Sequence, residues 1–190
     1  AARPLGDLMQ IPVLETPRLI LREHRASDFE PLVEFYADPV RSAGFGGVLS
    51  RNDTWRWLAS SIGHWQLRGY GFWTVEEKAN QQFAGLVGLW CPEGWREPEL
   101  GWILAANAEG RGIAYEAAFA ARTYTYDVMG WTTLTSNIIP GTTRSIALAE
   151  RLGARLDGSY HNDHMGGEIL VYRHPSPAEL DNDGNVEAYA

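Results

Sequence analysis

Apolar runs and amphipathic stretches alternate along this chain. Residues 72–76 and 83–90 are short and largely apolar, and the polar residues 78–81 join them, which predicts the two strands of a hairpin. Before this hairpin the pattern predicts a first helix over about residues 27–37 and a second over about residues 52–67. Helices and paired strands in one chain indicate a mixed α/β fold.

A strand–helix unit follows the hairpin. Residues 99–104 form an apolar strand, and a helix is predicted from Gly112 to about Met129. Small apolar side chains share one face of this helix, which would let it lie close against a sheet. These residues are Ala114, Ala117, Ala118, Ala121 and Val128.

A second strand–helix pair completes the pattern. Residues 132–138 predict a strand, Pro140 and Gly141 a turn, and a helix then begins at Thr142 or Thr143 and ends near Leu152. One apolar face of this helix includes a serine hydroxyl among larger side chains. That face carries Ser145, Leu148, Ala149 and Leu152.

The turn before the alanine-rich helix has the composition of a phosphate-binding loop. Residues 109–117 read Glu-Gly-Arg-Gly-Ile-Ala-Tyr-Glu-Ala. Gly110 and Gly112 leave room for a ligand beside the backbone, and the free N–H groups and dipole of the helix would favour an anion there. The glycines could equally serve the geometry of a tight turn alone.

Four segments of the chain together resemble the GNAT superfamily of acyl-CoA N-acyltransferases, in particular its ribosomal-protein N-terminal acetyltransferase (RimJ/RimL-like) branch. The segments are residues 16–22, 99–104, 110–117 and 144–154, and their order and spacing agree with the family over about residues 15–173. Three positions depart from the family pattern. They are Asn107, Thr142 and Ala149, where the family usually has Gln or Arg, Asn, and often Tyr.

The resemblance implies a single GNAT domain over residues 15–173, after a loose lead-in (1–14) and before an acidic tail (174–190) that we expect to be peripheral or disordered. Its fold would be a mixed, bent sheet of about seven strands flanked by about four helices. It also implies transfer of an acetyl group from acetyl-CoA to a primary amine, by direct attack in a ternary complex. A catalytically weak domain that binds acyl-CoA as a sensor or assembly module is the alternative.

By the same resemblance, the pyrophosphate would bind at the glycine loop, the pantetheine arm would pair with the strand over residues 99–104, and Thr142 and Ser145 would lie near the cofactor. The expected cofactor-binding residues are Trp102, Ile103, Leu104, Glu109, Gly110, Arg111, Gly112, Ile113, Ala114, Thr142 and Ser145.

Two residues are candidates for catalysis. Ser145 would lie near the leaving sulfur, or it would merely cap the first turn of its helix. Glu99 would act as the base for the amine, directly or through water, or it would be an exposed edge carboxylate.

The expected acceptor-binding residues are Phe45, Trp55, His164 and Glu168. The first two lie in the region that forms one wall of the acceptor site in the resembled family, and the last two in the final hairpin. The sequence of residues 161–164 could also suggest a metal site, but three ligands in a glycine-rich turn do not make a closed one, so we expect no metal.

Composition narrows the expected partners. The 190 residues carry a formal net charge of −8 and no basic cluster, which argues against nucleic acid or an anionic membrane as partner and favours a cationic amine, small molecule or peptide. The single cysteine, Cys91, excludes an internal disulfide framework, and no apolar run reaches the length of a membrane helix. We therefore expect a cytoplasmic protein; a homodimer is left open. A nucleotide-binding enzyme is a further alternative, but no third glycine completes a dinucleotide fingerprint after Gly110 and Gly112, which argues against it.

Overall fold

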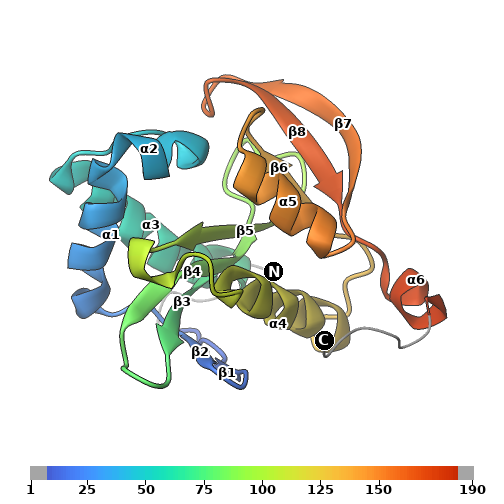
Figure 1. Cartoon of the computed structure of the whole chain (residues 1–190), viewed down its shortest axis with the longest axis horizontal. Helices are drawn as coiled ribbons and strands as arrows, with labels where there is room; N and C mark the ends of the chain where they lie inside the picture. The colour runs from blue at the N-terminus through green and yellow to red at the C-terminus, as the bar shows by residue number, and fades with distance from the viewer. Residues whose placement is uncertain (1–7, 184–190) are drawn as a thin grey trace.

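The computed structural model describes residues 8–183, in which eight strands form one mixed sheet (Figure 1). The strands lie in the order β1-β2-β3-β4-β5-β6-β8-β7. Their bounds are β1 Leu14–Glu15, β2 Leu19–Arg22, β3 Phe72–Glu77, β4 Phe83–Trp90, β5 Glu99–Leu104, β6 Thr135–Ile138, β7 Arg155–Asn162 and β8 Gly167–Arg173. The expected number was about seven; β1 is the additional strand, and its two residues are too few to produce an alternating pattern.

Four long helices match the predicted ones, and two short helices were missed. The long ones are α1 Phe29–Ala37, α3 Arg51–Arg68, α4 Ile113–Asp127 and α5 Thr143–Arg151. The short helix α2 (Pro39–Ser42) follows α1 directly, and Asp38 caps it by accepting from two backbone N–H groups. The other, α6 (Pro177–Asn182), begins with a capping box between Ser176 and Glu179.

The helices cover both faces of the sheet (Figure 1). Trp73 of β3 belongs to the core cluster that contains Ala117 and Ala121 of α4, whereas the neighbouring Phe72 belongs to a cluster with Leu32 of α1 and residues of α3. Successive strand residues therefore point to opposite layers. Of the face predicted for α4, Val128 is the exception, because the helix ends at Asp127 and leaves Val128 67% exposed.

The sheet opens between β5 and β6. These two strands run parallel, and their register pairs only Glu99 with Thr135, although β5 continues to Leu104 and β6 to Ile138. The other neighbouring strands are antiparallel and pair over two or more residues. The end of β5 therefore borders a gap in the hydrogen-bonded sheet.

The segment predicted to be a peripheral tail begins inside the domain. His174 is 3% exposed, and its backbone N–H donates to the Leu134 carbonyl. Its Nδ1 accepts a hydrogen bond from Arg122 at 3.2 Å, so the ring proton is on Nε2. Nε2 donates this proton to Ser136 Oγ at 2.8 Å. The parts of the predicted lead-in and tail over residues 1–7 and 184–190 lie outside the described residues.

Candidate functional site

The glycine loop presents free backbone donors at the start of α4. Gly110 and Gly112 have φ angles of 74° and 73°, a conformation that favours glycine. Gly112 precedes the helix without a side-chain cap, and the first N–H to bond back to its carbonyl is that of Glu116. The N–H groups of residues 113–115 therefore remain available at the positive end of the helix dipole, an arrangement that suits a phosphate.

A large cavity of about 1040 Å³ lies beside this loop, between the end of β5, α2 and the start of α5. Eight of the expected cofactor-binding residues line it: Trp102, Leu104, Glu109, Gly110, Gly112, Ala114, Thr142 and Ser145. The side chains of the other three turn elsewhere. Ile103 packs in the cluster with Phe72, Ile113 is buried in the core, and Arg111 donates to Glu77 at 3.0 Å.

Arginines surround the same cavity. Arg41, Arg144 and Arg151 line it from α2 and α5, and Glu109 forms ion pairs with the first two, at 2.8 Å for Arg144. The hydrogen bond from Arg144 is the largest effect that holds the pKa of Glu109 below its usual value, and Arg41 lowers it further. The cavity lining therefore holds three arginines against two carboxylates, Glu109 and Asp38, and this excess of positive charge favours a polyphosphate ligand.

The end of β5 directs its backbone groups into the gap. The carbonyls of Pro98 and Leu100 accept hydrogen bonds from the side chains of Thr135 and Ser136 on β6, at 3.4 and 2.7 Å. Backbone groups alternate in direction along a strand, so those of Trp102 and Leu104 face the same way, beyond the point where β6 diverges. An extended amide-containing chain fits there as an added strand.

Ser145 and Trp102 lie where the large cavity meets a smaller one, because both residues line both cavities. The Trp102 indole Nε1 donates to Ser145 Oγ at 3.3 Å, and Ser145 is 7% exposed. The N-cap of α5 is Thr142, so Ser145 is the third residue of the helix and does not cap it. The serine is therefore held at the junction by a neighbour on β5.

Glu99 is buried in the smaller cavity, not exposed at a strand edge. It is 9% exposed, and burial raises the pKa of its carboxyl to about 7. Trp95 Nε1 donates to its Oε1 and the Asn137 backbone N–H to its Oε2, each at 3.0 Å, and both bonds lower the pKa against the burial effect. A carboxyl with such a pKa can exchange a proton near neutral pH.

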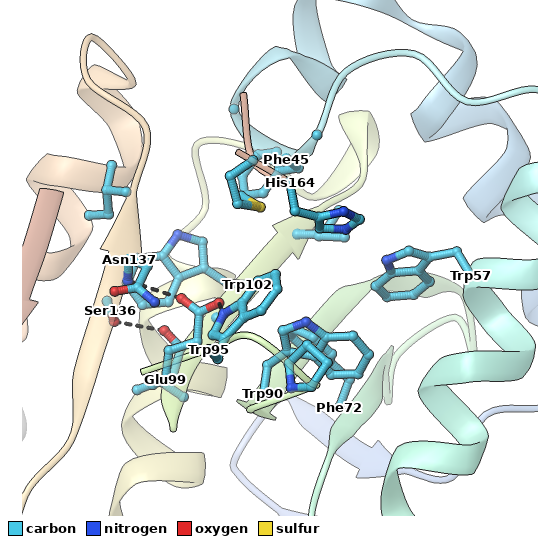
Figure 2. Close-up of a pocket in the computed structure, with 18 of the residues that line it drawn as sticks. Phe45, Trp57, Phe72, Trp90, Trp95, Glu99, Trp102, Ser136, Asn137 and His164 are labelled. Atoms are coloured by element: carbon cyan, nitrogen blue, oxygen red, sulfur yellow. Dashed lines mark hydrogen bonds between the residues drawn. The ribbon is translucent and has the colours of Figure 1, made fainter. Parts of the chain in front are cut away.

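The smaller cavity has a volume of about 470 Å³ and an aromatic lining (Figure 2). Of the four expected acceptor-binding residues, Phe45 and His164 line it. Trp55 does not: it is 59% exposed on the outer face of α3. Glu168 is exposed on β8 and also lies outside the lining. Trp57, which was not among the expected residues, does line the cavity.

Helical spacing could have distinguished the two tryptophans of α3. Trp57, Ser61 and His64 fall at i, i+4 and i+7, and the last two are buried. Trp55 falls off this face. The sequence also missed Trp95 and Asn137, which donate to Glu99. No local pattern indicates these, since their role depends on loops and strands that meet only in the folded chain.

Residues 8–183 contain neither a cluster of metal ligands nor a helix suited to span a membrane. Within them no three His, Cys, Asp or Glu side chains come together as a metal site, and His161 instead pairs with Asp163 at 2.6 Å. None of the described helices is long and apolar enough to span a membrane.

Known proteins with similar sequences and structures identify the family. A family profile described as "Acetyltransferase (GNAT) domain" matches residues 18–155. A crystal structure of an acetyltransferase from Agrobacterium tumefaciens str. C58 is 34% identical, with a TM-score of 0.79, and the match covers 87% of this chain and 95% of that one.

Two further proteins are more distant. The uncharacterized protein YkkB of Bacillus subtilis (strain 168) is 29% identical over 126 residues, which are 62% of this chain and 70% of that protein. The ribosomal L7/L12 α-N-protein acetyltransferase RimL is 17% identical with a TM-score of 0.70, over 86% of this chain and 94% of that one, which shows a shared fold. The profile covers more than half of the chain, and the chain therefore belongs to the GNAT acetyltransferase family, whose members transfer acyl groups from acetyl-CoA.

Proposed function

We propose that this protein transfers an acetyl group from acetyl-CoA to a primary amine by direct attack in a ternary complex. The observation that carries the proposal is the junction of the two cavities at Trp102 and Ser145, with Glu99 buried in the smaller one. The large cavity has the phosphate-binding loop and the open end of β5, so it suits the cofactor. The smaller cavity is left for the amine.

Glu99 is the proposed base. An amine must lose a proton as its nitrogen forms a bond to the acetyl carbon, and most alkyl amines are protonated at neutral pH. A carboxylate with a pKa of about 7 is a stronger base than an ordinary glutamate and is still largely ionised just above neutrality. The Trp95 and Asn137 donors hold both carboxylate oxygens in place, directly at the amine or one water away.

Ser145 is the proposed donor to the departing sulfur. As the bond between the acetyl carbon and the sulfur breaks, the sulfur takes up negative charge and finally a proton. The Trp102 hydrogen bond uses a lone pair of Ser145 Oγ, so the hydroxyl proton can point to another partner. Ala149, where many family members have tyrosine, lies one turn further along α5, and its methyl side chain offers no such donor.

Replacement of Glu99 by Gln tests the proposal, because it keeps the shape and removes the basicity. We expect kcat/KM for an alkyl amine to fall about a hundredfold or more. For the native enzyme kcat/KM should rise through about pH 7, the pKa of Glu99, whereas for Glu99→Gln the rise should move to more alkaline pH. The measurement is CoA release as a function of pH, with the exposed Glu168→Gln as the control.

Two other results would contradict the role of Glu99 or the catalytic activity itself. An unchanged rate and pH profile in Glu99→Gln, with loss of rate in His164→Gln, would place the base in the final hairpin. Binding of acetyl-CoA without turnover of any amine would favour the alternative, a domain that binds acyl-CoA as a module. Asn107 and Ala149 favour this alternative, since Asn107 Nδ2 donates to Gln82 at 3.2 Å instead of turning to the cofactor loop.

A further inference from the structure

The smaller cavity is walled by aromatic rings that support one another. Trp57 stacks on Trp90 with centroids 6.0 Å apart and planes at 28°, and Phe72 lies 5.9 Å from Trp57 and 5.2 Å from Trp90. The two tryptophans are half-buried, so part of each ring is accessible from the cavity. Figure 2 shows this wall, which we call the aromatic wall: Trp90 lies beside Glu99, its register partner on β5, and Trp57 on α3 lies farther from Glu99.

A neutral histidine backs the aromatic wall. His64 stacks on Trp90 with centroids 4.4 Å apart. Its Nε2 accepts from the Cys91 backbone N–H at 3.0 Å, so its Nδ1 carries the proton and donates to the Tyr70 carbonyl at 2.7 Å. Burial keeps the pKa of His64 below its usual value. The ring behind Trp90 is thus uncharged and held in place by two hydrogen bonds.

The described residues of the cavity lining include carboxylates and no Arg or Lys. The carboxylates are the buried Glu99 and the exposed Glu93. A ligand with one amino group finds one buried partner, Glu99. A ligand with several ammonium groups would have to place the others against the aromatic wall, away from buried carboxylates, where cation–π attraction offsets only part of the desolvation cost.

Resting on the proposed function, we propose that the acceptor is a small primary amine that carries an aromatic ring, an arylalkylamine. Its amino group would lie at Glu99 and its ring against Trp57 and Trp90. A volume of about 470 Å³ lies within the range of small-molecule sites. Offset and edge-on contacts between rings stabilise such a ligand beyond the burial of its area.

A panel of amines compares the candidate classes. We expect kcat/KM for 2-phenylethylamine to exceed that for n-butylamine, for the diamine putrescine and for a short peptide with a free N-terminus, by about tenfold or more. A higher value for putrescine or for the peptide would overturn the proposal.

Two tryptophans of α3 provide a matched pair of variants. Trp57→Ala should raise KM for 2-phenylethylamine about tenfold and change KM for n-butylamine much less. Trp55→Ala should change neither, because Trp55 is exposed outside the cavity. Equal losses for both amines in Trp57→Ala would overturn the proposal. Trp57→Leu, which fills more of the space, replaces Trp57→Ala if circular dichroism shows that the latter is unfolded.

Measuring amine binding without turnover tests the aromatic acceptor independently of the proposed acetyl transfer. Calorimetric titration of 2-phenylethylamine and n-butylamine into the protein with CoA present reports on the cavity without turnover. Tighter binding of the aromatic amine, lost in Trp57→Ala, supports the inference even if no amine is acetylated. Turnover of amines with equal binding of the two probes retains the proposed function and rejects the aromatic acceptor.

Discussion

The orientation of the Ser145 hydroxyl depends on a hydrogen bond from a residue on another element, Trp102. This hydroxyl lies on the inner face of α5, one turn before Ala149, and the indole of Trp102 on β5 fixes its orientation. The two residues are 43 positions apart in the chain, yet together they form the boundary between the two cavities. A donor at this boundary can reach a group in either cavity.

Loss of this donor should affect the chemical step more than cofactor binding. We expect Ser145→Ala to lower kcat by about ten- to a thousandfold, because one acid or polar stabiliser of the transition state is removed. The affinity for acetyl-CoA, measured by calorimetry, should change little. Ser145→Thr keeps a hydroxyl and should recover part of the rate. An unchanged kcat in Ser145→Ala would leave Ser145 as a partner of Trp102 only.

At the scale of elements, the site depends on where two of them end. Helix α4 begins directly after Gly112, so its free N–H groups lie at the large cavity. Strand β5 separates from β6 after Glu99, so its last residues border the same cavity. Both features are interruptions of regular hydrogen bonding, and each leaves backbone groups available for a ligand.

Gly112 and Gly130 form a matched pair for testing the loop. Both have a φ of 73°, one before and one after α4, so valine strains the backbone similarly at either position. Only Gly112 lines the large cavity. We expect acetyl-CoA to raise the melting temperature of the native protein and of Gly130→Val, and not that of Gly112→Val. A folded Gly112→Val protein with the full shift would mean that the phosphates bind elsewhere.

For the whole molecule, buried titratable groups link stability to pH. Burial lowers the pKa of His24 to about 4 and that of His174 to about 3, and it lowers the pKa of His64 as well. It raises the pKa of Glu99 to about 7. Below pH 6.5 the unfolded chain binds protons on these histidines that the folded chain does not bind, so acid favours unfolding. Glu99 has the opposite effect, because between pH 4.5 and 7 the folded chain binds its proton more tightly than the unfolded chain does.

The histidines outnumber Glu99, so stability should fall as the pH is lowered from 6.5 to 5. Each proton in excess contributes about 1.4 kcal/mol per pH unit to this slope. His174→Gln should reduce the slope by roughly one proton, because Gln can still accept from Arg122 and donate to Ser136 without titrating. The exposed His161→Gln is the control. Urea unfolding at several pH values measures the slope; an unchanged slope in His174→Gln would contradict the argument.

The sequence by itself determined the elements and the family. Four long helices, the strand over residues 99–104 and the glycine turn before α4 follow from periodicity and from glycine placement, which act within a few residues of each other. The short elements β1 and α2 were not predicted because two and four residues are too few for a hydrophobic pattern to repeat. The candidate phosphate-binding loop could be recognised in the sequence for the same local reason, since its donors belong to consecutive residues.

Only the tertiary structure decided the environment of each side chain. Glu99 is a buried carboxyl because Trp95, Asn137 and the walls of the smaller cavity enclose it, and no residue within its own strand indicates this. Trp57 lines that cavity while Trp55 faces outward, and Arg41 reaches Glu109 across 68 positions of sequence. Burial and charge depend on segments that are distant in the chain. Local patterns therefore predicted the segments that line the candidate site, and packing determined which side chains line its cavities.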